Sequence, residues 1–159
     1  MIVVADSSPL HYLILIEQSD VLQRLYTEVA IPKGVVAELV RPSSPFEVRN
    51  WLAQPPPWLR VETVTSEVVA TVLKTLDLGE REAIALAETM KADLLLIDES
   101  AGRAEARRRH LRVTGTLGVL RTAAEFGLVD VPDVLSRLRM TNFYVDEALL
   151  RAVFGHWLE

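Results

Sequence analysis

Short apolar runs alternate along the chain with longer amphipathic segments, and this alternation predicts strands and helices in turn. Strands are expected at residues 2–5, 29–31, 61–64, 94–97 and 111–114. Helices are expected from Ser8 as N-cap and Pro9 as first helical residue, from Pro32 onward, and at residues 80–91, 101–110, 116–126 (closed by Gly127), 131–139 and 146–158. Strands that alternate with helices form parallel sheets covered on both faces. The pattern therefore predicts an α/β fold, a three-layer α/β/α sandwich around a central, mostly parallel sheet.

Composition narrows the class of protein. The chain has 159 residues, half of them hydrophobic, and no cysteine, which fits one domain over residues 1–159 without disulfides or thiolate zinc sites. No apolar run reaches the ~20 residues of a transmembrane helix, and the N-terminus lacks the basic start of a signal peptide, so we expect a cytoplasmic protein that does not bind membranes. The net charge of −5 argues against nonspecific coating of nucleic acid. It does not argue against an enzyme that meets a phosphodiester through a bound metal.

Two acidic residues stand at the ends of predicted strands. Asp6 follows the strand at residues 2–5, and Asp98 follows the strand at residues 94–97. Ligand sites of open parallel sheets lie at the carboxyl ends of the strands. We therefore expect both carboxylates at the same edge of the sheet.

Helical spacing brings two glutamates to the same region. The apolar stripe of the helix at residues 80–91 places Glu80 on its inward edge and Glu82 on the polar side. Glu38 lies on the apolar face of the helix that begins at Pro32. Both glutamates are therefore expected to face inward.

Four carboxylates, those of Asp6, Glu38, Glu80 and Asp98, can thus converge on one rim. Unpartnered carboxylates repel one another, and a hard divalent cation such as Mg²⁺ or Mn²⁺ relieves that repulsion. Sites of this kind hydrolyse phosphodiesters by activating a water and stabilising the charged transition state. Each acid taken alone also fits a helix cap or a partner of a helix dipole, so a purely structural role stays open.

Basic residues gather just after Asp98. They are Arg103, Arg107, Arg108, Arg109 and Arg112. Arg103 and Arg107, one helical turn apart, form either a solvated helix face or a contact to the RNA backbone. Thr116, at the start of the next helix, either caps that helix or borders the substrate pocket. The apolar stripe of the last helix is expected to pack on the core of the chain or to meet a partner.

Five segments, taken in order, resemble the PIN-domain family and in particular its VapC-type toxin ribonucleases. They are residues 4–10, 32–39, 78–87, 96–99 with Gly102 and Arg103, and 114–118. The resemblance implies an α/β/α sandwich and an RNA endonuclease that depends on Mg²⁺ or Mn²⁺. It further implies the toxin of a toxin–antitoxin pair, with an antitoxin protein as partner and a homodimer as assembly. The family's four acids, which serve both metal binding and catalysis, correspond to Asp6, Glu38, Glu80 and Asp98, with Glu82 as a second choice for the third.

One departure from the family pattern keeps an alternative function open. Many PIN nucleases carry a further acid and an aromatic residue just after the last acid, where this chain has Ser100 and Ala101. The alternative is a catalytically degenerate PIN-like module that binds RNA or a protein partner without cleaving. A phosphoacceptor receiver domain is disfavoured because no lysine follows Lys91, and an Asp-x-Asp phosphatase because Ser8 stands two residues after Asp6.

Overall fold

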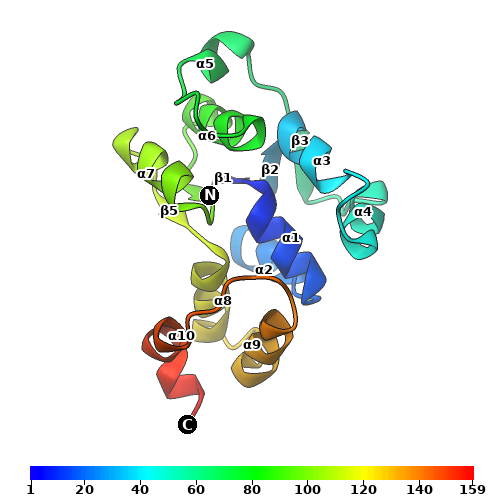
Figure 1. Cartoon of the computed structure of the whole chain (residues 1–159), viewed down its shortest axis with the longest axis vertical. Coiled ribbons are helices and arrows are strands. Elements are labelled where there is room, and N and C mark those ends of the chain that lie inside the picture. Colours follow the sequence, from blue (N-terminus) through cyan, green and yellow to red (C-terminus); the bar gives the residue numbers. More distant parts are fainter.

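The computed structural model describes residues 1–159 and is built around a five-stranded sheet in which all strands are parallel (Figure 1). The strands are β1 (Val3–Ala5), β2 (Val29–Pro32), β3 (Leu59–Glu62), β4 (Leu94–Leu96) and β5 (Val113–Thr114), in the spatial order β3-β2-β1-β4-β5. The chain builds outward from β1 in one direction and then returns to add β4 on the other side of it. The strand order therefore reverses between β1 and β4, which is where open α/β sheets bind ligands.

Helices cover both faces of this sheet. They are α1 (Ser7–Leu15), α2 (Asp20–Tyr26), α3 (Lys33–Leu39), α4 (Phe46–Ala53), α5 (Ser66–Ala70), α6 (Leu78–Met90), α7 (Ser100–Arg108), α8 (Thr116–Glu125), α9 (Val131–Arg139), α10 (Glu147–Phe154) and the 3-10 helix η1 (Gly155–Trp157). In Figure 1, α5, α6 and α7 lie above the sheet and α1, α2 and α8 below it, with α9 and α10 beyond. The expected α/β/α sandwich is confirmed, with a fully parallel sheet. None of the helices combines the length and apolarity that a membrane crossing requires.

The apolar patterning accounts for the core. All three residues of β1 are buried, and forty hydrophobic residues form one cluster between the layers. The last helix belongs to it, since Leu150 and Phe154 are buried within the chain. Gly127 has a φ of +67° and closes α8: its own N–H bonds to the carbonyl of Ala124, and the next N–H bonds to that of Ala123. The predicted end of this helix is confirmed.

The first helix begins two residues earlier than predicted. Asp6, not Ser8, is its N-cap, because Asp6 is still extended (φ −80°, ψ 173°) and Ser7 is already helical. Pro9 remains within the first turn, where its missing N–H has no helical partner to lose. The shift frees the Ser7 and Ser8 hydroxyls from capping and turns them toward the edge of the sheet.

Candidate active site

Asp6 and Asp98 lie on the two sides of the point where the strand order reverses. Asp6 directly follows β1, and its N–H donates to the carbonyl of Leu96 in β4 at 2.8 Å. Asp98 follows β4 by one residue, Ile97. The predicted placement of both aspartates at the carboxyl edge of the sheet agrees with the structure.

Asp6 is a buried carboxyl group with an unused oxygen. The residue is 2% exposed, and its Oδ1 has no hydrogen-bond partner. Burial raises the pKa of Asp6 to about 7, aided by the nearby charges of Glu38, Asp77 and Asp98 and opposed by the backbone N–H of Ser7. An acid held in this way takes up a proton near neutral pH or accepts a cation instead.

Glu80 shares these properties. It sits in the first turn of α6, is 7% exposed, and has a buried Oε2 without a partner. Burial and the adjacent carboxyl of Asp77 raise the pKa of Glu80 to about 8, and Asp6 adds to the shift. Gly102 of α7 makes room for it, because a Cβ at that position would stand 2.7 Å from Glu80 Oε2. Glu80 therefore faces the sheet edge, as its helical position predicts.

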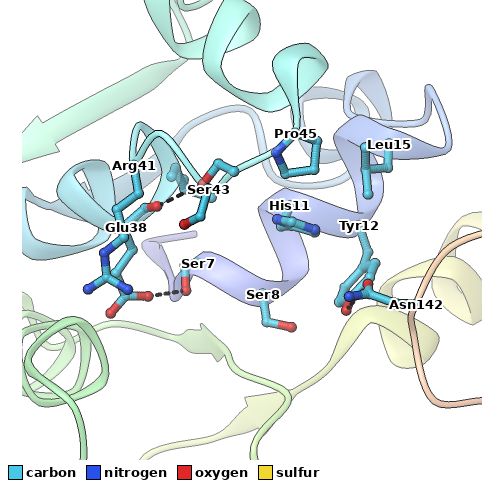
Figure 2. A pocket seen from close by; sticks show the side chains of 12 residues that line it. Ser7, Ser8, His11, Tyr12, Leu15, Glu38, Arg41, Ser43, Pro45 and Asn142 are labelled. Carbon is cyan, nitrogen blue, oxygen red and sulfur yellow. Dashed lines mark hydrogen bonds between the residues drawn. The ribbon is translucent and has the colours of Figure 1, made fainter.

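Glu38 is partly buried and is held by α1. The Ser7 hydroxyl donates to Glu38 Oε2 at 2.6 Å (Figure 2). Its other oxygen lies against Gly79 of α6, where any Cβ would collide with it. Burial and the charge of Asp77 raise the pKa of Glu38, whereas the Ser7 bond and the nearby Arg41 lower it.

Asp98 differs from the other acids in being fully hydrogen-bonded. Oδ1 accepts the Thr116 N–H at 2.7 Å, and Oδ2 accepts the hydroxyls of Thr116 at 2.7 Å and Ser8 at 2.9 Å. Thr116 is fully buried and gives both donors to Asp98, so its observed role is to hold this carboxylate. A direct contact between Thr116 and a substrate stays a prediction.

The helical position of Glu82 suggests a side chain on the polar side of α6, yet this partly exposed side chain has a partner in another helix. Its Oε1 accepts the backbone N–H of Gly34 at 2.9 Å, in the first turn of α3. Helix α3 has no side-chain cap of its own, since its N-cap is Pro32. The packing of α6 on α3 therefore uses Glu82 to cap a neighbouring helix, an arrangement that the spacing within α6 alone cannot reveal.

Three residues of the site were not predicted from the sequence. Ser7 and Ser8 hold Glu38 and Asp98, and Asp77 lies beside two of the acids. Asp77 caps α6 by accepting the Glu80 N–H at 2.8 Å. The signal for Asp77 was present, because an aspartate three residues before a glutamate at a helix start is typical of a helix N-terminus.

The arginines after Asp98 divide into two groups. Arg108 and Arg109 both bind the buried Glu105 and so belong to the fold. Arg107 is exposed and forms no ion pair, while Arg103 donates to the carbonyl of Ile97 at 3.1 Å. Burial and the charge of Arg107 lower the pKa of Arg103. A contact of Arg103 or Arg107 with RNA stays a prediction.

The acids fit a hard cation by chemistry but do not form a closed ion site. No three acidic or histidine side chains come together tightly enough to hold an ion. The donors are all oxygens, and two of them, on Asp6 and Glu80, are buried without partners. Oxygen donors of this kind suit Mg²⁺ or Mn²⁺.

Two cavities flank this edge. One, of about 550 Å³, lies between α1 and the loop after α3 (Figure 2). The other, of about 850 Å³, includes Asp98 and Arg103 in its wall. Ser8, Tyr12 and Asn142 line both cavities and form the ridge between them. Glu38 is thus open to a ligand from the first cavity and Asp98 from the second, whereas Asp6 and Glu80 line neither.

Comparison with known proteins gives one result that covers the chain. A family model described as a PIN domain matches residues 2–159, and no curated protein matches the sequence. PIN domains are generally nucleases that use divalent metals, which agrees with the oxygen donors at the carboxyl edge of the parallel sheet. The match extends over all five strands and all four acids, and the chain therefore belongs to the PIN-domain family.

Proposed function

We propose that the protein is an RNA endonuclease that depends on Mg²⁺ or Mn²⁺. One observation carries the proposal: Asp6 and Glu80 each bury a carboxylate oxygen that no group of the protein satisfies. Unpaired buried carboxylates are costly unless a proton or a cation relieves them. By the resemblance, Asp6 and Glu80 correspond to two of the family's acids. They lie near the point where the strand order reverses.

Asp6 and Glu80 would hold the ion, with Glu38 and Asp98 as the flanking acids. When bound, such an ion supplies an activated water and stabilises negative charge on the phosphate. Other residues of the chain hold the flanking acids in position. Ser7 fixes Glu38, and Ser8 with Thr116 fixes Asp98.

Two arginines are placed to receive the substrate. Arg103 lines the larger cavity next to Asp98, and Arg107 is exposed one turn further along α7. Guanidinium groups bind phosphate oxygens in pairs of parallel hydrogen bonds. We infer that they hold the RNA backbone beside the acids.

The test is cleavage of RNA with and without metal. We expect cleavage with Mg²⁺ or Mn²⁺, none in EDTA, and recovery when metal is restored. Asp6→Asn and Glu80→Gln should each lower the rate by at least about 100-fold. Glu125→Gln, at an exposed position on α8, is the matched control and should cut at the normal rate. Cleavage that persists in EDTA would refute the metal mechanism.

We further propose that the protein is the toxin of a toxin–antitoxin pair and a homodimer. The resemblance to VapC-type proteins supports both. A small gene next to this one whose product co-purifies with the protein is the expected finding for the pair. Light scattering at micromolar concentration should give twice the mass of one chain, and a monomer mass would contradict the dimer.

Ser100 and Ala101 support a second candidate, a module that binds RNA without cutting it. These residues stand where many PIN nucleases carry a further acid and an aromatic. RNA that binds in a filter assay but stays intact with every metal would favour this candidate over the nuclease.

A further inference from the structure

The 550 Å³ cavity adjoins the acids, but of the four only Glu38 lines it, and neither of the two acids proposed to hold the ion does. Figure 2 shows Glu38 and Arg41 at one end, Tyr12 and Asn142 at the other, and His11 between them. Glu38 is tied to Ser7 at the first end. A ligand that placed a phosphate at the acids would therefore extend its neighbouring groups into this cavity.

The walls of the cavity are held in place before any ligand arrives. The loop after α3 is fixed because the Ser44 hydroxyl donates to the Glu38 carbonyl at 3.0 Å and the Ser44 N–H donates to the Arg41 carbonyl at 2.9 Å. On the other side, the Tyr12 hydroxyl donates to Asn142 Oδ1 at 2.8 Å. Small-molecule sites are mostly pre-formed cavities of roughly 300–1,000 Å³, and this one falls within that range.

The polar groups in the cavity suit an uncharged, planar ligand. His11 forms no hydrogen bond, and burial lowers the pKa of His11, so its neutral ring offers one donor and one acceptor. Asn142 accepts from Tyr12, which leaves its amide N–H groups free to donate. The Pro45 ring and the side chain of Leu15 supply apolar surface. Donors, acceptors and apolar walls of this kind recognise the edge and faces of an unpaired base.

The positive charge at the Glu38 end of the cavity also fits a nucleotide. Arg41 is exposed and forms no ion pair, although it lies close enough to Glu38 to lower the pKa of that carboxyl. It is the only basic side chain in the lining apart from His11. A single guanidinium at the entrance fits a phosphate that links the base to the next nucleotide.

We propose that this cavity receives one unpaired nucleobase of the RNA, next to the phosphate at the acids, and that His11 and Asn142 read the edge of that base. The inference rests on the proposed ribonuclease function. It makes the enzyme selective for one base beside the cut and for single-stranded RNA.

The first test maps cut sites in a pool of random single-stranded RNA. The wild type should prefer one base at a fixed position beside the cut. His11→Ala and Asn142→Ala should flatten that preference at least about fivefold. Asn142→Asp keeps the acceptor for Tyr12 but loses the amide donors, so it should change the preferred base. His156→Ala removes an exposed histidine in η1 and should keep the wild-type preference.

The second test needs no cleavage. The four nucleoside 5′-monophosphates are titrated in EDTA while NMR follows the His11 ring and the Asn142 side-chain amide, and one base should shift both signals. RNA cleavage with a base preference that His11→Ala and Asn142→Ala leave unchanged would overturn the inference but keep the nuclease. If no RNA is cut, the nuclease fails, and the NMR result alone decides. Unshifted signals with all four monophosphates would overturn base recognition and leave the cavity to a segment of a protein partner.

Discussion

Two regions of the molecule bury carboxyl groups with opposite results. Glu105 on α7 is 4% exposed, about as buried as Asp6 and Glu80 at the sheet edge. Yet hydrogen bonds lower the pKa of Glu105 to about 2, while burial raises the pKa of Asp6 to about 7 and that of Glu80 to about 8. A small exposed fraction alone therefore does not set the pKa of a carboxyl group in this protein.

The difference comes from the partners that each region supplies. Glu105 accepts from Arg108 at 2.7 Å, from Arg109 at 3.2 Å and from the Leu73 N–H at 3.0 Å. Arg109 also bonds to Glu88 and to the Thr71 carbonyl, so the network ties the loop after α5 to α6 and α7. Asp6 Oδ1 and Glu80 Oε2 find no such donors. The hydrogen-bonded network around Glu105 stabilises the fold, whereas the unpaired oxygens of Asp6 and Glu80 are available to a ligand.

Removing Glu105 should have the largest effect on stability. Glu105→Ala leaves the mostly buried Arg109 with one carboxylate partner fewer and leaves the Leu73 N–H without an acceptor. Breaking a buried ion pair from one side costs about 3–5 kcal/mol. Urea unfolding should report a loss of this size. Glu125→Ala breaks only the exposed pair with Arg121 and should cost under ~1 kcal/mol. Equal losses for the two variants would contradict the comparison.

The pH dependence of stability should also distinguish the sheet edge with Asp6 and Glu80 from the network around Glu105. Burial raises the pKa of Asp6 from 3.8 to about 7 and that of Glu80 from 4.5 to about 8. The native state then holds more protons than the unfolded state, so metal-free protein loses stability as pH rises from about 4 to 8. The loss is up to about 4 kcal/mol for Asp6, at about 1.4 kcal/mol per pKa unit. Glu105 acts in the opposite sense, and its contribution is lost only as pH falls from about 4.5 to 2.

Asp6→Asn isolates this effect. Asparagine resembles the protonated acid, so the variant should match the wild type near pH 4 and exceed its stability near pH 8, both in EDTA. The difference in unfolding free energy between the two proteins is measured across this range. A difference that stays constant with pH would show that Asp6 does not titrate as proposed.

Sequence reasoning succeeded where a residue's place depends on the chain next to it. Asp6 and Asp98 were predicted because each follows a short buried strand, and parallel strands carry their ends to one edge. Glu80 was predicted because the apolar stripe of a long helix fixes which side faces inward. The sandwich followed from the same periodicities.

Sequence reasoning failed where packing between segments that are distant in the sequence decides the local structure or the contacts of a residue. The pattern predicts no helices at residues 20–26, 46–53 and 66–70, because these are short, and the structure buries only one to three residues of each. Helical spacing explains why Glu105 meets Arg108 and Arg109, three and four residues after it, but it does not reveal the further partners of Arg109. Arg109 contacts Thr71, 38 residues away, and no period in the sequence encodes that contact.

Metal binding should further distinguish the acids at the sheet edge from Glu105. At 100 times its Kd, a ligand that binds only the folded state stabilises it by about 2.7 kcal/mol. We expect Mn²⁺ to raise the melting temperature of the wild type accordingly, and more at pH 8 than at pH 6, because Asp6 and Glu80 must lose protons to bind it. Asp6→Asn, Glu80→Gln and Asp98→Asn should lose the shift. Full shifts in both Asp6→Asn and Asp98→Asn would mean that the metal pocket does not exist.

Glu82 gives the smallest expected effect and the sharpest control. It lies two residues from Glu80 on α6, but its carboxylate accepts the Gly34 N–H and faces the N-terminus of α3. Glu82→Gln keeps an acceptor there and loses only the charge that favours a helix N-terminus, so the cost should be about 0.3–1 kcal/mol. A Cβ at Gly34 would stand 3.0 Å from the Glu82 carboxyl carbon, so this carboxyl packs closely against the start of α3. The Mn²⁺ shift should therefore equal that of the wild type. If Glu82→Gln loses the shift while Glu80→Gln keeps it, the pocket stands, and the third ligand is Glu82.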